Sequence, residues 1–131
     1  MSTPLSDYLF MFRGANWDKN LSPEELQKAM AKITAWLEEL QKQGRIKGGQ
    51  PLGDEGRMVS NVKHRTDGPF VETKEMVGGY LLLQAADLDE AIAIAESSPQ
   101  LEYGVSIEVR PVLEECPVTT RVKKQLALAA A

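Results

Sequence analysis

One histidine, His64, is the side chain in this sequence whose unperturbed pKa lies near neutral pH. Asp67 follows three residues later, close enough along the chain to orient the imidazole. A histidine positioned by a carboxylate can act as general base or general acid, so this pair is the candidate catalytic couple. The alternative is a histidine at a strand end that hydrogen-bonds a local partner and does no chemistry.

A second set of residues has the chemistry to hold a small anionic or aromatic molecule. Glu108 and Arg110 are two residues apart and therefore share one face of a strand, and Lys74 would add a second cation. These groups could bind an anion through charge-assisted hydrogen bonds, or they could form a structural ion pair. Tyr80 could stack on a ligand or pack in the core.

Metal and cofactor chemistry finds little support in the sequence. One histidine and one cysteine do not make a convincing zinc site. Cys116 has no sequence neighbour that would activate it as a nucleophile. The pairs Gly48-Gly49 and Gly78-Gly79 lack the spacing of a phosphate-binding loop. We therefore expect no metal and no cofactor.

The segment that would position most of these groups runs from Arg65 to Tyr80. Asp67-Gly68-Pro69 predicts a tight turn, because glycine accepts positive φ and proline fixes its own φ. Phe70 would anchor this loop to the body of the protein and is also a candidate ligand-binding residue. Gly78-Gly79 predicts a bulge or a close backbone approach. The loop either joins two strands with its charges in water, or closes one end of a ligand pocket.

Two helices carry clear start signals. Ser22 is the expected N-cap of the first, with Pro23 at its first position, Glu25 completing a capping box and Gly44 as the stop. Its predicted buried stripe consists of Leu26, Met30, Ile33, Leu37 and Leu40. The second begins at Asp87 with Glu90 as box partner, and its predicted buried stripe consists of Leu88, Ala91, Ile92 and Ala95.

Four strands are predicted by apolar runs and alternation: Asp7–Arg13, Arg57–His64, Tyr80–Ala85 and Val105–Arg110. The segment from Arg45 to Gly56 is predicted to be a loop, with at most a short edge strand around Leu52. The order β-α-β-β-α-β predicts an α+β, ferredoxin-like fold, an antiparallel sheet with both helices on one face.

The first and third predicted strands are apolar on both faces, whereas helices would cover only one face. The uncovered side would be a larger apolar patch than soluble monomers normally expose. We therefore expect a homodimer through the sheet faces, a dimeric α/β barrel, although the C-terminal tail could cover part of that face instead. Residues 1–112 form the predicted domain, and residues 113–131 form a tail, broken at Cys116-Pro117, with a short helix that is frayed or docked on the partner.

Length and composition limit the class of protein. A chain of 131 residues has the usual length of a single domain. Its net charge of −4 disfavours non-specific binding to nucleic acid. No apolar run approaches a membrane span, and no signal segment is evident. A single cysteine excludes an internal disulfide, which fits a cytoplasmic protein.

From about Leu5 to Val112 the chain resembles the DGPF type of the YCII-related family. The matching segments are Gly44 to Leu52, Asp67-Gly68-Pro69-Phe70 with Glu72-Thr73-Lys74-Glu75, Gly78-Gly79-Tyr80, Leu88-Asp89-Glu90-Ala91 and Glu108-Val109-Arg110-Pro111. The resemblance independently implies a ferredoxin-like fold and a dimer. Relatives of the YCII type are suspected enzymes, some linked to the breakdown of chlorinated aromatics, and DGPF-type proteins often occur beside alternative sigma factors.

The suspected activity of that family rests on a histidine at the start of the first helix and an aspartate before a proline after the second. This chain departs at both places, because residues 14–28 contain no histidine and Ser98 precedes Pro99. Three functions follow as alternatives. The first is a dimer that binds a small molecule between the sheet and the Asp-Gly-Pro-Phe loop, in a sensory or accessory role in transcription regulation. The second is a cofactor-independent lyase or monooxygenase-like enzyme that uses His64 and Asp67, and the third is a structural interaction domain.

Overall fold

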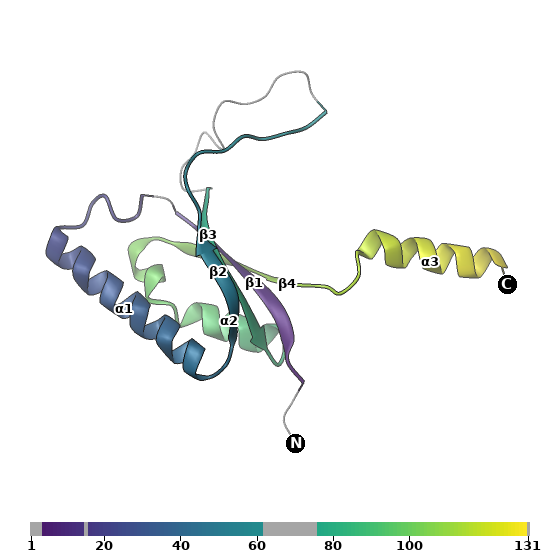
Figure 1. The fold of residues 1–131 in the computed structure, drawn as a ribbon, viewed down its shortest axis with the longest axis horizontal. Coiled ribbons are helices and arrows are strands. Elements are labelled where there is room, and N and C mark those ends of the chain that lie inside the picture. The colour runs from purple at the N-terminus through teal and green to yellow at the C-terminus, as the bar shows by residue number, and fades with distance from the viewer. Residues whose placement is uncertain (1–3, 15, 62–75, 131) are drawn as a thin grey trace.

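The computed structural model describes residues 4–14, 16–61 and 76–130, and they form a four-stranded sheet with helices (Figure 1). In chain order the elements are β1 (Ser6–Arg13), α1 (Pro23–Lys42), β2 (Ile46–Pro51), β3 (Val77–Ala85), α2 (Leu88–Glu96), the 3₁₀ turn η2 (Pro99–Tyr103), β4 (Ser106–Pro111) and α3 (Pro117–Ala130). Neighbouring strands are antiparallel in the order β2-β3-β1-β4. The expected ferredoxin-like fold is confirmed.

The hydrophobic core lies on one face of this sheet. Phe10 of β1 and Leu83 of β3 are fully buried there, and they share a cluster with Leu40 of α1 and Ala91 and Ala95 of α2. Because both helices contribute to the same cluster, they cover the same face, as Figure 1 shows. The alternate residues of β1 and β3 point to the other, uncovered face.

Helix α1 begins as its sequence predicts. The Ser22 hydroxyl accepts a hydrogen bond from the Glu25 amide, and the Glu25 carboxylate accepts one from the Ser22 amide. These bonds satisfy amide groups that the first turn leaves without intrahelical partners. The predicted stripe is wrong at Met30, which is 47% exposed, because the buried face of α1 is centred on Ala29, Ile33 and Leu40.

Helix α2 is capped by Asp87, whose carboxylate accepts a hydrogen bond from the Glu90 amide at 2.8 Å. The Glu90 carboxylate does not return to Asp87 but accepts from the Ala86 amide at 2.9 Å and pairs with Arg45 at 2.7 Å. The predicted stripe of this helix is also partly wrong. Ala91 and Ala95 are buried, whereas Leu88 and Ile92 are 42% and 39% exposed.

The second strand is not where the alternation predicted it. Residues 46–51 pair with β3, whereas Arg57 to Asn61 form no strand and the rest of the predicted strand lies outside the described residues. The glycines that suggested a loop are instead what permits the pairing. A Cβ atom on Gly49 would lie 2.6 Å from the Tyr80 carbonyl oxygen, so no larger residue fits there without a shift of the backbone.

The glycine pair before Tyr80 produces the predicted bulge. Phe12 pairs with Gly79 and Arg13 with Val77, so that Gly78 is the extra residue on β3. The bulge lies at the end of the sheet where β1 leaves toward α1, which opens space beside Phe12 and Arg13.

The C-terminal segment forms a longer helix than the tail pattern predicted. Cys116-Pro117 does not interrupt structure but begins α3, with proline at the first position, where its missing amide costs nothing. None of the residues of α3 is buried, and Figure 1 shows the helix standing away from the sheet. Within the described residues, no helix is long and apolar enough to cross a membrane.

Candidate functional site

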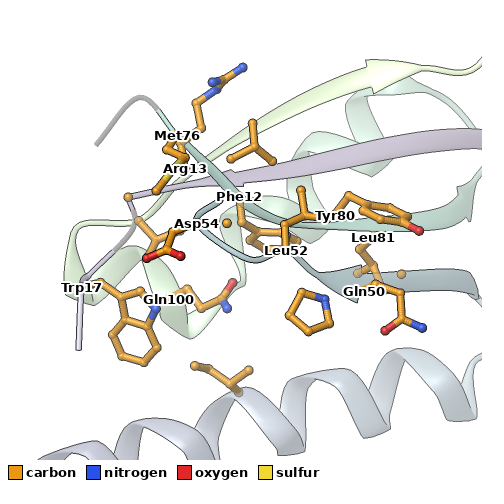
Figure 2. A pocket seen from close by; sticks show the side chains of 18 of the residues that line it. Phe12, Arg13, Trp17, Gln50, Leu52, Asp54, Met76, Tyr80, Leu81 and Gln100 are labelled. Atoms are coloured by element: carbon orange, nitrogen blue, oxygen red, sulfur yellow. The ribbon is translucent and has the colours of Figure 1, made fainter. Parts of the chain in front are cut away.

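A cavity of about 540 Å³ lies between α1 and the end of the sheet at which β1 leaves and β2 finishes (Figure 2). Five separate segments build it: the end of β1 with the loop after it, the middle of α1, the end of β2 with the residues beyond it, the start of β3, and η2. Most of its wall is apolar, as is typical of a small-molecule site.

Both tryptophans of the chain line this cavity. The Trp36 indole N–H donates a hydrogen bond to the Ser97 hydroxyl at 2.9 Å, which holds the ring against the end of α2. Trp17 lies against Tyr103 with ring centroids 5.5 Å apart and an interplanar angle of 38°. Two indoles with defined orientations therefore provide flat apolar surface for a ligand.

A small number of polar groups interrupt the apolar wall. Figure 2 shows the Asp54 carboxylate and the Gln100 amide on the same side of the cavity as Trp17. Gln100 is positioned by its neighbour, since the buried Ser98 hydroxyl accepts from the Gln100 backbone amide at 3.3 Å and donates to the Gln100 side-chain oxygen at 3.4 Å. Hydroxyl groups of a ligand would find both donors and acceptors here.

A charged cluster lies on the opposite, uncovered face of the sheet. The Arg13 guanidinium contacts the Glu108 carboxylate at 2.9 Å, and Arg110 approaches its other oxygen at 3.5 Å. Hydrogen bonding from Arg13 is the main cause that lowers the pKa of Glu108. Figure 2 shows the same guanidinium directed away from Trp17. The aliphatic part of Arg13 therefore borders the cavity, whereas its charged group lies on the uncovered face of the sheet.

The predicted ligand-binding residues are distributed unevenly. Glu108 and Arg110 do lie together, as their spacing implied, but neither lines the cavity. Tyr80 is among the residues that line the cavity, and alternation with buried Leu81 puts its ring on the uncovered face of the sheet. Met11 pairs with Tyr80 on one side and with Glu108 on the other, so these three side chains form one row across the sheet.

Four predicted site residues fall outside the described residues: His64, Asp67, Phe70 and Lys74. Their roles stay predictions. Among the residues that the structure does describe, no cluster of histidine, cysteine, aspartate or glutamate could hold a metal ion. The sequence did not point to Asp54, Gln100 or either tryptophan as site residues, because they come from segments that only the folded chain brings together.

The fold and the cavity together define a ferredoxin-like domain with a lateral, mostly apolar cavity. The model of the YCII-related domain matches residues 9–115, so the chain belongs to the YCII-related family. No curated protein sequence matched significantly. Among solved structures, the chain is similar to the 5-chloro-2-hydroxyhydroquinone dehydrochlorinase of Burkholderia phenoliruptrix in complex with 2,5-dihydroxybenzoquinone, at 18% identity and a TM-score of 0.52, covering 86% of this chain and 96% of that one.

A second solved structure, the hydroxynitrile lyase of Passiflora edulis, aligns at 17% identity with a TM-score of 0.37, covering 88% of this chain and 100% of that one. At these identities the likeness to the dehydrochlorinase supports the fold and nothing more specific.

Proposed function

We propose that this protein binds a small, flat, hydroxylated molecule in the cavity between α1 and the sheet. The observation that carries the proposal is the pair of tryptophans, both held in place on the wall of one cavity of about 540 Å³. That volume lies within the range of about 300–1,000 Å³ that is usual for ligand pockets. Flat apolar surfaces on rigid rings favour an aromatic or quinone-like ligand over an aliphatic one.

The polar groups favour a neutral ligand over an anionic one. Asp54 adds a negative charge to the cavity wall, and the guanidinium of Arg13 is directed to the other face, where it pairs with Glu108. An anion in the cavity would therefore meet like charge without a described cation facing it. Hydroxyl groups, in contrast, could donate to Asp54 and exchange hydrogen bonds with Gln100.

The solved neighbour suggests a pair of probes. The dehydrochlorinase was captured with 2,5-dihydroxybenzoquinone, a flat ring whose two enolic hydroxyl groups are acidic and ionised at neutral pH. Hydroquinone is a flat ring of similar size whose two hydroxyl groups stay neutral there, so it is the probe that matches this cavity, and the benzoquinone is its anionic comparison. Binding of such a ring without turnover would suit the sensory or accessory role that the sequence suggested, in a cytoplasmic protein.

The second candidate function is catalysis on such a ring. The chain belongs to the YCII-related family and shares its fold with the dehydrochlorinase, an enzyme that acts on a chlorinated, hydroxylated ring. In that case we propose His64 as the general base and Asp67 as the group that orients it. Ser98 stands where the family's suspected aspartate is expected, and it is 4% exposed and bonded to Gln100. Catalysis in this chain would therefore not use a carboxylate at that position.

We also propose that the protein is a homodimer through the uncovered face of the sheet. Leu9, Met11 and Leu82 form the centre of that face, where β1 and β3 pair. Ion pairs lie at its edges: Lys47 with Asp7 at 2.9 Å on one side, and the Arg13–Glu108–Arg110 cluster on the other. An apolar centre with a polar rim is the usual anatomy of a protein interface.

Calorimetric titration with hydroquinone tests the binding proposal, and 2,5-dihydroxybenzoquinone, which is ionised at neutral pH, should bind less tightly because Asp54 lies on the cavity wall. Replacing Trp17 by alanine should weaken binding by roughly tenfold or more, because a stacked aromatic surface contributes about 1–3 kcal/mol. Leu52→Ala, also on the cavity wall, should weaken it less. Leu113→Ala is the matched control, since it removes an exposed leucine remote from the cavity.

If Trp17→Ala and Leu113→Ala bind these rings equally well, the ligand site is not this cavity. If His64→Ala retains whatever turnover is detected with a chlorinated hydroquinone, the catalytic assignment fails while the binding proposal stands.

A further inference from the structure

An apolar groove of about 340 Å³ lies on the helix-covered side of the molecule, between α2 and the edge strand β4. Its walls are Ile92, Ala95, Leu101, Ile107 and Val109, with Glu96 at its rim. Ile92 and Leu101 are 39% and 40% exposed, although both are large apolar side chains. The groove explains why Ile92 of the predicted α2 stripe is exposed: its side chain lines this opening.

Helix α3 carries an apolar stripe that is exposed in the same way. Val118, Val122 and Leu126 recur at four-residue spacing and therefore lie on one face of the helix. Val122 is 46% exposed and Leu126 is 65% exposed. A helix of 14 residues is marginal in water without tertiary packing, so this face needs a partner surface to stabilise it.

The two surfaces are also complementary in charge. Helix α3 contains Arg121, Lys123 and Lys124 and has no acidic residue, whereas α2 contains Asp89, Glu90 and Glu96 and has no basic residue. Arg121 and Lys123 flank the apolar stripe on either side, and Glu96 borders the groove. Opposite charge around two apolar strips would guide and orient their contact.

The chain leading into α3 runs from the end of β4 away from the sheet (Figure 1). The Val112 amide donates to the Asp7 carbonyl at 3.0 Å, which extends the β4 ladder, and Glu115 holds the helix start through Lys123 at 2.6 Å and Thr120 at 3.0 Å. Figure 1 shows α3 on the opposite side of the sheet from α1 and α2. In this conformation the stripe cannot reach the groove of its own subunit.

A second copy packed on the uncovered face would bring its own groove within reach. Facing sheets lie about 10 Å apart, and a helix layer lies about 10 Å beyond its sheet. A 14-residue helix is about 21 Å long, which spans that depth. We propose that α3 of one copy packs its Val118–Val122–Leu126 stripe into the α2–β4 groove of a second copy. This contact between the two copies rests on the sheet-to-sheet homodimer proposed above.

Cross-linking between differently tagged chains tests this exchange, in the full-length protein with its single cysteine replaced by Cys116→Ser. One chain carries Val122→Cys and the other carries Ile92→Cys, and a short bifunctional maleimide is added to the mixture. The expected result is a covalent dimer of the two tagged chains. Lys124→Cys in place of Val122→Cys is the matched control, because it lies on the opposite side of α3 and should lose the cross-link.

Two outcomes would overturn the proposal. One is a cross-link that forms only inside a single chain carrying both Val122→Cys and Ile92→Cys, which would place α3 in its own groove. The other is equal cross-linking by the Val122 and Lys124 variants, which would mean random collision. Light scattering on the same samples reports the mass separately. A dimer without the specific cross-link would therefore reject the exchange alone, whereas a monomer would reject the sheet-to-sheet pairing.

Discussion

The two faces of the sheet are made from alternate residues of the same strands, yet they serve different purposes. On the covered face, Phe10 and Leu83 are fully buried beneath α1 and α2, and the cavity opens where this packing ends. On the uncovered face, Met11 and Leu82 are only half-buried and are surrounded by ion pairs. The comparison shows that the packed core lies on one face, whereas the ion pairs and the proposed dimer contact lie on the other.

The largest expected effect concerns stability. Phe10→Ala should lower the free energy of unfolding by about 3–5 kcal/mol, because it leaves a cavity in a core that cannot fully collapse. Met11→Ala, its neighbour on the other face, should cost clearly less. Urea denaturation of both variants at one protein concentration measures the difference. Equal losses would show that the uncovered face is as tightly packed as the core.

The next effect concerns assembly. Met11→Asp introduces a charge at the centre of the uncovered face and should convert the proposed dimer to a monomer without unfolding the domain. Light scattering at micromolar concentration measures the mass, and circular dichroism checks the fold. The control is Met30→Asp, an exposed methionine on α1. A wild-type protein that is monomeric at that concentration would contradict the pairing.

The smallest effect concerns the charged cluster on that face. The pKa of Glu108 is lowered mainly by the hydrogen bond from Arg13, so its pKa in the folded protein lies below the ordinary value for a glutamate. A carboxylate with a lowered pKa contributes stability that is present above about pH 4.5 and is lost as the pH falls through the folded pKa. Glu108→Gln should therefore be less stable than wild type at pH 6, and the gap should narrow at about pH 3.

Thermal unfolding of wild type and Glu108→Gln across that range measures the change. Glu114→Gln is the control, because the structure gives that exposed carboxylate none of the ion pairs described here. A gap that stays constant with pH would mean that the Arg13 contact does not persist in solution.

Local signals predicted local structure well. The caps at Ser22 and Asp87, the helix end at Gly44 and the bulge at Gly78 all follow from short-range hydrogen bonding and backbone preference, and all are present. Predictions failed where pairing between distant segments decides the outcome. Residues 57–61 alternate like a strand, but β3 pairs instead with the glycine-containing segment 46–51.

The sequence by itself determined the element order, the ferredoxin-like fold, family membership and the presence of two apolar surfaces on one sheet. Only the tertiary structure decided where a ligand could bind, because Trp17, Trp36, Leu52 and Gln100 come from four segments whose convergence no local pattern encodes. It also decided that Ile92 of the α2 stripe faces an open groove. The direction of a helix face depends on what packs beside it, and a periodic pattern shows only that such a face exists.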